Sequence, residues 1–178
     1  MKIIVASDIH GSNYYTKKLT KIIEKENPDQ IILLGDIYYH GPRNKLPKGY
    51  APIKVAESLN KYASIIKCVK GNCDAEVDQM ISKFKIEDSF ELSHLNKKFL
   101  FVHGQHLDFE NLPLGYDYIF GGHTHVSQIK QINSTTYINP GSLAIPKEKT
   151  KNSYLVITDN NITIYDFKDN IINSINLI

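Results

Sequence analysis

The chain has few cysteines, no long apolar run and little net charge, and each shortage argues against a class of protein. Its two cysteines, Cys68 and Cys73, are too few for the disulfide framework of a small secreted domain. No segment approaches the roughly 20 apolar residues of a membrane span, and the apolar run in MKIIVASDIHG is too short for a signal peptide. The formal net charge of +2 is far from the strongly basic charge that is typical of nucleic-acid-binding proteins. We therefore expect a cytoplasmic protein that does not bind a membrane.

Length and composition fit an ordinary globular domain. The chain has 178 residues, of which 42% are hydrophobic and 22% are charged. Domains commonly contain about 100–200 residues. A chain of this size buries a sizeable core without needing disulfide bonds or structural metal ions for stability. We therefore predict a single domain over residues 1–178, with no repeats and no linker.

The order of apolar segments in the first half predicts an α/β arrangement. Three short buried strands alternate there with two amphipathic helices, at residues 2–7, 14–26, 31–34, 53–62 and 64–69. Such alternation is typical of a parallel sheet with helices as crossovers. The sheet is therefore expected to begin parallel and doubly wound.

The second half has a different pattern. After a helix expected at residues 77–84, strands separated by short turns are expected at 89–95, 98–103, 118–120, 128–132, 135–138, 154–158, 162–167 and 171–177. Short connections favour antiparallel pairing, so we expect this half to be mostly antiparallel. Together the two halves predict two sheets packed face to face with helices outside.

Polar residues gather where five of the predicted strands end. The strand exits carry Asp8 and His10, Asp36, Asn72 to Asp74, His103, and His123 with His125, each near a glycine. In an open parallel sheet these exits meet at one edge, where such folds bind ligands. A lone His or Asp in a loop is most often a solvent-facing residue, but five such exits in one chain indicate a site. Carboxylate, imidazole and carboxamide groups suit divalent ions such as Mn, Fe or Zn.

The motifs DIH, GD, GNCD, HG and GGHTH, in this order, resemble those of the calcineurin-like metallophosphoesterases. They extend over residues 8–125. The stretches GDIYYHGPRNKLPKGYAPIKVAESLN, GNCDAEVDQM and NPGS resemble more narrowly the small bacterial phosphodiesterases of the YfcE type. The resemblance implies an α/β fold, a four-layer α/β/β/α sandwich of two mixed sheets.

The resemblance also implies a dinuclear metal site and a reaction. It assigns Asp8, His10 and His125 to one ion, Asn72, His103 and His123 to the other, and Asp36 as the bridge. The ions would be Mn2+, with Fe, Zn, Ni or Co as alternatives. The implied reaction is hydrolysis of a phosphate diester by attack of a metal-bridging hydroxide, with no covalent intermediate. Asp36, Asn72 and His123 would thus belong to the catalytic machinery.

Other polar residues have two interpretations each. Arg43 either binds a phosphate oxygen through the N–H groups of its planar guanidinium or is a surface residue of a long loop. His40 is a candidate for contact with the substrate, and His106 is a candidate for supporting a metal ligand, because it closely follows His103. The alternative for each is a solvent-facing loop residue. We expect the Asp74 carboxylate to orient a neighbouring ligand, and the NPGS turn to support the floor of the site.

Cys73 has three interpretations. It could be a metal ligand, but Asn72 is already the expected ligand from this loop. It could be a nucleophile, but that needs a lowered thiol pKa, which the negative charges of Asp74 and Glu76 would oppose. We favour the third, based on the motif GNH[DE] of many related phosphoesterases, in which a histidine assists the leaving group. A thiol is a weak donor, so its presence here predicts a preference for diesters with low-pKa leaving groups.

Two other functions are alternatives to a phosphodiesterase. A phosphomonoesterase could use the same scaffold, and a non-catalytic protein-binding module of the same fold is a less favoured alternative. The expected partner is a small-molecule phosphodiester, with nucleic acid only as a substrate. Pairing of two copies through exposed strand edges near the C-terminus is left open.

Overall fold

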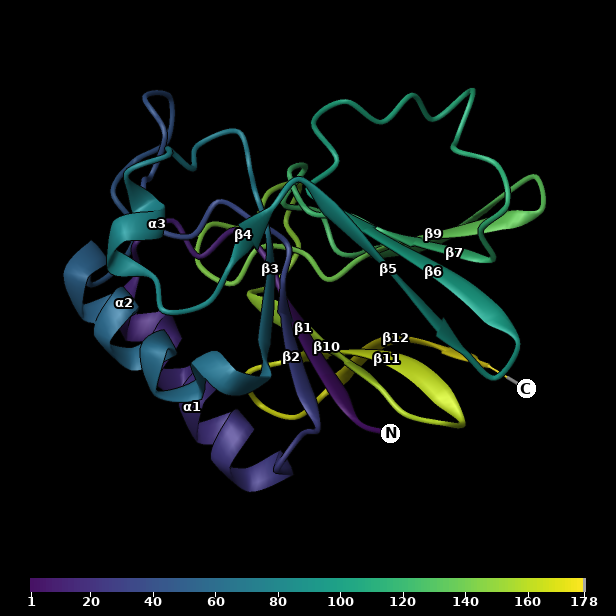
Figure 1. The fold of residues 1–178 in the computed structure, drawn as a ribbon, viewed down its shortest axis with the longest axis horizontal. Helices are drawn as coiled ribbons and strands as arrows, with labels where there is room; N and C mark the ends of the chain where they lie inside the picture. The colour runs from purple at the N-terminus through teal and green to yellow at the C-terminus, as the bar shows by residue number, and fades with distance from the viewer. Residues whose placement is uncertain (178) are drawn as a thin grey trace.

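Two mixed β-sheets packed face to face make up the fold, and helices cover one outer side (Figure 1). The computed structural model describes residues 1–177, so Ile178 lies outside the described part of the predicted 1–178 domain. The first sheet has the strand order β12-β11-β10-β1-β2-β3-β4, and the second has the order β5-β6-β7-β9-β8.

The first sheet is built on the parallel strands of the N-terminal half. Its strands are β1 (Ile3–Ala6), β2 (Gln30–Leu33), β3 (Ile66–Val69), β4 (Ile86–Glu87), β10 (Ser153–Ile157), β11 (Asn161–Asp166) and β12 (Ile171–Asn176). Strands β1 to β4 run parallel, and β10, β11 and β12 extend the sheet beyond β1 as an antiparallel meander. The crossovers pass through α1 (Asn13–Glu26) and α2 (Pro52–Leu59). The expected parallel beginning is therefore present.

The second sheet is mixed. The expectation of a mostly antiparallel second half holds for most strand pairs of that half, but not for the centre of this sheet. Its strands are β5 (Ser89–His94), β6 (Lys97–Val102), β7 (Tyr118–Phe120), β8 (Gln128–Ile132) and β9 (Thr135–Asn139). The hairpins β5–β6 and β8–β9 are antiparallel, but β6, β7 and β9 run parallel to one another. The connections between these parallel strands contain no helix among the described residues, which removed the usual sequence signal of a parallel pair.

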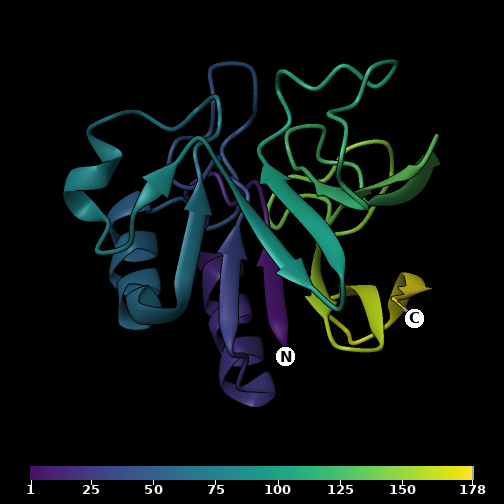
Figure 2. The ribbon, with the colours of Figure 1, turned by 45° about the vertical axis from the view of Figure 1, so that its right-hand side comes forward.

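The side chains of β1 point alternately to the two faces of the first sheet, which shows how the sheets are packed. Ile3 and Val5 contact the second sheet in a core that includes Phe99, Phe101 and Phe120. The intervening residues of β1 face the opposite way, into the core beneath α1 and α2. Because the strand is buried on both faces, it reads as a continuous apolar run. Figure 2 shows the two sheets with the helices on one side only.

The outer face of the second sheet is covered by a loop. Residues 103–117 cross this face, and Leu112 packs there against Leu100, Ile119 and Tyr137. Figure 1 shows this long segment above the strands that it connects. The helices of residues 1–177 therefore lie on the first sheet, and the layer outside the second sheet is irregular.

Two helices end earlier than the sequence predicts. α2 ends at Leu59 and a 3-10 helix (Asn60–Ile65) follows, so β3 begins only at Ile66. The helix predicted at 77–84 is limited to α3 (Asp78–Ile81). The Gln79 side chain explains the early end, because its amide bonds the carbonyl of Phe84 at 2.9 Å and the N–H of Ile86 at 3.0 Å. These contacts fix an extended segment that continues into β4, a strand that the sequence did not indicate.

Candidate metal centre

The carboxyl ends of strands from both sheets meet at one place. β1, β2 and β3 of the first sheet and β6 and β7 of the second end there, and they are followed by Asp8 and His10, Asp36, Asn72, His103, and His123 with His125. The structure therefore brings together the side chains of all seven predicted metal ligands. They fall into two groups that share Asp36.

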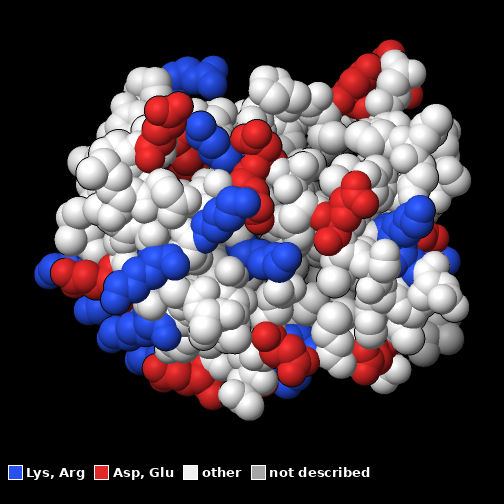
Figure 3. Space-filling view, in the orientation of Figure 1, with Lys and Arg blue, Asp and Glu red and all other residues white. Residues whose placement is uncertain are grey.

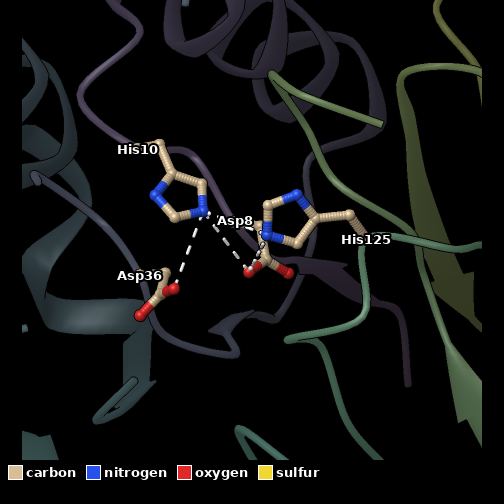
Figure 4. Close-up of side chains that lie close together, drawn as sticks. All are labelled: Asp8, His10, Asp36 and His125. Atoms are coloured by element: carbon tan, nitrogen blue, oxygen red, sulfur yellow. Dashed lines mark hydrogen bonds and ion pairs between the residues drawn. The ribbon is translucent and has the colours of Figure 1, made fainter. Parts of the chain in front are cut away.

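The first group consists of Asp8, His10, Asp36 and His125. All four are buried, and one potential ligand atom from each lies within 4.8 Å of the others. His125 Nε2 is 3.2 Å from Asp8 Oδ1, and His10 Nε2 is 3.6 Å from Asp36 Oδ2. Figure 4 shows both rings directing a nitrogen toward the carboxylates. This is a compact set of carboxylate and imidazole groups that could hold a metal ion.

The second group forms around Asn72. Its side-chain oxygen Oδ1 lies 2.7 Å from His123 Nδ1 and 3.1 Å from His103 Nε2. His103 Nε2 is in turn 3.5 Å from Asp36 Oδ2. The same Asp36 oxygen thus faces a histidine of each group.

Backbone carbonyls fix the orientation of three of the histidine rings. His10, His103 and His125 place Nδ1 at 2.8, 2.5 and 2.8 Å from the carbonyl oxygens of Tyr39, Leu34 and Ile145 respectively. A carbonyl only accepts, so each Nδ1 carries the proton and each Nε2 is free to act as a ligand. His10 Nε2 and His125 Nε2 are 3.2 Å apart. Two lone pairs at that distance repel each other, so the geometry requires a positive species between them.

The charges of the site point the same way. Asp8 Oδ1 is buried and accepts no hydrogen bond. Burial alone would raise the pKa of Asp8, but contacts with His10 and His125 hold it well below its usual range. Burial would lower the pKa of His103, yet the Asp36 carboxylate raises it to about 9. The carboxylates therefore stabilise positive charge in the centre, and the donor types present suit a divalent cation, which binds neutral imidazole.

Five of the seven predicted ligands have an unusual backbone conformation. Asp8, His10, Asp36, His123 and His125 have positive φ values of 55°, 48°, 55°, 62° and 62°. Such conformations cost on the order of 1 kcal/mol each and persist only where surrounding contacts hold them. Here the N–H of Asp8 donates to the Gly35 carbonyl at 3.1 Å, and the N–H of His10 donates to the Asp36 carbonyl at 2.8 Å. Strain of this kind clusters at functional sites.

Asp74 holds the Asp36 loop in place. Its buried carboxylate accepts hydrogen bonds from the backbone N–H groups of Asp36, Ile37 and Gly71 at 2.7, 2.8 and 2.8 Å. Gly71 is required because a Cβ at this position would collide with Asp36 Oδ1. Asp74 is therefore engaged with backbone and positions the loop rather than facing the centre.

Cys73 contacts Asp36 through its backbone. Its N–H donates to Asp36 Oδ1 at 2.7 Å, while its Sγ accepts a hydrogen bond from Asn72 Nδ2 at 3.3 Å. Burial and the nearby Asp36 carboxylate raise the pKa of the thiol to about 12. A protonated thiol is a poor nucleophile and a poor ligand. Cys68 lies buried in the core beneath the helices.

The NPGS turn supports the loops of β1 and β7 from below. Ser142 Oγ donates to the Asp8 carbonyl at 2.8 Å, and Asn139 Nδ2 donates to the Gly122 carbonyl at 2.6 Å. Both residues are fully buried. The turn therefore ties the loops carrying Asp8 and His123 to the end of β9.

A cavity of about 710 Å³ opens onto the centre and contains Arg43. Tyr39 and Lys147 also line it, and neither was predicted from the sequence. Both lie in loops outside any periodic pattern, and no apolar run ends in either residue, so no sequence signal marks them.

The remaining predicted histidines lie elsewhere. His40 is not among the residues lining the 710 Å³ cavity and packs edge-on against Tyr50, with ring centroids 5.2 Å apart. His106 lines a separate cavity of about 480 Å³ beside His103. His94 lies in β5, and its Nε2 is 2.8 Å from Asp159 Oδ1.

Residues 1–161 match the calcineurin-like phosphoesterase superfamily domain, and the chain belongs to this family. Phosphodiesterase YfcE of Escherichia coli (strain K12) is 40% identical over 172 residues, which cover 95% of this chain and 94% of that protein. The solved structure of YfcE, described as a phosphoesterase from E. coli, matches with a TM-score of 0.96 and 35% identity over 100% of both chains. Vps29 of Entamoeba histolytica, solved with zinc, matches with a TM-score of 0.66, 16% identity and 99% of each chain, which shows the shared fold alone.

These matches confirm three predictions made from the sequence: the family, the fold class of two mixed sheets, and membership of a phosphoesterase enzyme class. The family and the buried Asp–His cluster together indicate divalent metal ions as cofactors.

The surface carries no concentrated charge on the face shown in Figure 3, where lysine and arginine are interspersed with aspartate and glutamate. This agrees with the formal net charge of +2. Within residues 1–177, no helix has both the length and the apolar character needed to cross a bilayer.

Proposed function

We propose that the chain hydrolyses phosphate diesters at a centre of two divalent metal ions. Asp8, His10 and His125 would hold one ion, Asn72, His103 and His123 the other, with Asp36 between them. The observation that carries the proposal is the position of Asp36 Oδ2, which lies 3.6 Å from His10 Nε2 and 3.5 Å from His103 Nε2. We propose Mn2+ as the metal, with Fe, Zn, Ni or Co as alternatives, because the donors are oxygen and imidazole nitrogen.

Two divalent ions held here would supply Lewis acidity toward the phosphate and activation of water. The residues of the chain supply orientation. The Cys73 N–H occupies one oxygen of Asp36 and leaves the other to face the centre. The Asn72 amide is turned by its contact with Cys73 Sγ, so that Oδ1 faces the histidines. Arg43 is placed in the cavity to bind a phosphate oxygen of the substrate through its planar guanidinium.

The proposed function predicts metal-dependent cleavage of a diester. The protein loaded with Mn2+ is expected to hydrolyse bis(p-nitrophenyl) phosphate and to cleave p-nitrophenyl phosphate at least tenfold more slowly. Chelation with EDTA followed by gel filtration should remove at least 99% of the activity, and added Mn2+ should restore it. Release of p-nitrophenolate measures both rates.

The same assay separates the alternatives. A faster rate on the monoester would favour the phosphomonoesterase. Absence of hydrolysis with any divalent metal would favour the non-catalytic binding module. We favour the enzyme because a residue able to coordinate metal occupies each of the seven positions.

Cys73 is proposed to set the preference for the leaving group. A thiol with a pKa of about 12 is a poor proton donor. Replacing Cys73 by His should add a donor and increase kcat/KM for a diester with an alkyl leaving group by about tenfold or more. For bis(p-nitrophenyl) phosphate, whose leaving group needs little assistance, the change should stay below about threefold.

Cys73→Ser is the matched control, because it changes the side chain at the same position without adding a titratable donor near neutral pH. Metal content of all three proteins should be equal by plasma mass spectrometry. An unchanged leaving-group preference in the histidine variant, with full metal content, would contradict the role assigned to Cys73.

We further propose a small-molecule diester as the physiological partner, with nucleic acid only as a substrate, and a cytoplasmic location. Both cysteines are free, which suits a reducing compartment. Pairing of two copies also stays a prediction. β12 is an outer strand of the first sheet and exposes Ile171 and Ile172, which are 64% and 37% accessible.

A further inference from the structure

The wall of the 710 Å³ cavity has two chemically different parts. Its inner part consists of metal-binding candidates such as His10, Asp36 and His123. Its outer part includes Tyr39, Arg43 and Lys147, which come from two loops far apart in the sequence. An aromatic ring and two cations are therefore available beyond the groups needed to bind metal.

Tyr39 is held beside the centre while its ring stays accessible. Its carbonyl accepts the Nδ1–H of His10 at 2.8 Å, which ties the backbone of Tyr39 to a metal-binding candidate. Its ring packs edge-on against the His40 ring, with centroids 4.8 Å apart and planes at 67°. The residue is nevertheless 43% exposed. A fixed, accessible aromatic ring at a cavity wall is suited to stack on a planar group of a ligand.

The two cations have no carboxylate partner of their own. Within residues 1–177, neither Arg43 nor Lys147 takes part in an ion pair. The carboxylates that line the cavity are Asp36, which faces His10 and His103, and Asp74, which accepts backbone N–H groups. Their charge is already engaged, so the outer wall presents net positive charge to a ligand.

Lys147 is also anchored to the centre. Its backbone N–H donates to the His125 carbonyl at 3.2 Å, and its own carbonyl accepts the Thr150 hydroxyl at 2.7 Å. Arg43 lies in the loop after β2, whereas Lys147 lies in the loop after β9. A diester phosphate carries a single negative charge, which Arg43 is placed to bind. The second cation therefore indicates a second anionic group on the substrate.

We propose that this outer wall is a subsite for the non-reacting arm of the diester, in which Tyr39 stacks on a planar ring and Lys147 pairs with an additional anionic group. The inference rests on the proposed function and narrows the substrate class to nucleotide-like diesters that carry a further phosphate.

The test uses diesters that share one leaving group, so that differences arise from the other arm. The probes are methyl p-nitrophenyl phosphate, thymidine 5′-(p-nitrophenyl phosphate), and the same thymidine ester with a 3′-phosphate. For the wild type, kcat/KM should increase at least tenfold from the first probe to the second and several-fold further for the third, mainly through KM. Stacking of one base supports an effect of about tenfold.

Variants separate the two contacts. Tyr39→Ala should lower the ratio of kcat/KM for the thymidine ester to kcat/KM for the methyl ester by about tenfold, whereas Tyr39→Phe should retain this ratio. Tyr14 lies outside the cavity, so Tyr14→Ala should leave the ratio unchanged. Lys147→Met should remove the gain from the 3′-phosphate, about fivefold, and Lys147→Arg should retain it. Equal ratios in the wild type and in Tyr39→Ala and Lys147→Met would overturn the subsite.

A binding measurement keeps the two proposals distinguishable. Calorimetric titration of a non-hydrolysable methylphosphonate analogue of the third probe should show weaker affinity for Tyr39→Ala and Lys147→Met than for the wild type. Hydrolysis of all three probes at equal efficiency would overturn the subsite and leave the diesterase intact. Binding of the analogue without hydrolysis of any probe would support the subsite and overturn the proposed reaction.

Discussion

Asp36→Asn is expected to lower kcat for bis(p-nitrophenyl) phosphate by about 10²–10³-fold. The amide has nearly the same shape and can still accept the Cys73 N–H, which lies 2.7 Å from Oδ1. It lacks the negative charge that the other oxygen presents to His10 and His103. Two cations close together repel each other, so an uncharged bridge should also reduce the metal content below two ions per chain. Initial rates and plasma mass spectrometry measure the two effects.

Asp108→Asn provides the control for this substitution. Asp108 lies in the exposed loop between β6 and β7, where it accepts the Glu110 N–H at 2.9 Å. Its change should leave both rate and metal content within about twofold of the wild type, because surface substitutions of this kind perturb little. Equal rates for the wild type and Asp36→Asn would contradict the bridging role.

Asp74→Ala is expected to lower the free energy of unfolding by about 3 kcal/mol or more. The substitution removes the acceptor for the backbone N–H groups of Asp36, Ile37 and Gly71, all in buried surroundings. Each unsatisfied buried donor costs about 1–3 kcal/mol. Urea denaturation measures the loss, and diester hydrolysis should fall with it because the Asp36 loop loses its support.

Asp78→Ala is the matched control from the same segment. Its carboxylate accepts the exposed N–H of Ala75 at 2.8 Å, and water can replace that contact. The expected loss is therefore below about 1 kcal/mol. A loss for Asp74→Ala no larger than for Asp78→Ala would show that the three amides find other partners.

The sequence predicts the candidate ligands because each follows a short apolar run closely. Asp8, Asp36 and His103 come soon after a strand that is recognisable from its buried residues alone. Parallel strands bring their carboxyl ends together, so strand exits in the chain become neighbours in space. The grouping around the shared Asp36 came from the family resemblance rather than from spacing.

The outer wall of the cavity could not be predicted in this way. Tyr39 and Lys147 lie in loops, whose paths depend on contacts such as that between the Tyr39 carbonyl and His10. The limits of α3 depend on the side-chain amide of Gln79, which competes with the backbone for hydrogen bonds. The parallel run of β6, β7 and β9 was missed because loops rather than helices connect these strands. Each of these features is set by tertiary contacts that leave no periodic pattern.

The left-handed backbone at five of the candidate ligands has a consequence for how such a chain can change over generations. At about 1 kcal/mol each, their conformations together approach the lower end of a domain's net stability, roughly 5–15 kcal/mol. Glycine relieves this strain but has no side chain to bind metal. A lineage selected for stability alone would therefore be drawn toward losing Asp8, His10, Asp36, His123 and His125. The strained positions therefore coincide with the residues that we propose to bind metal.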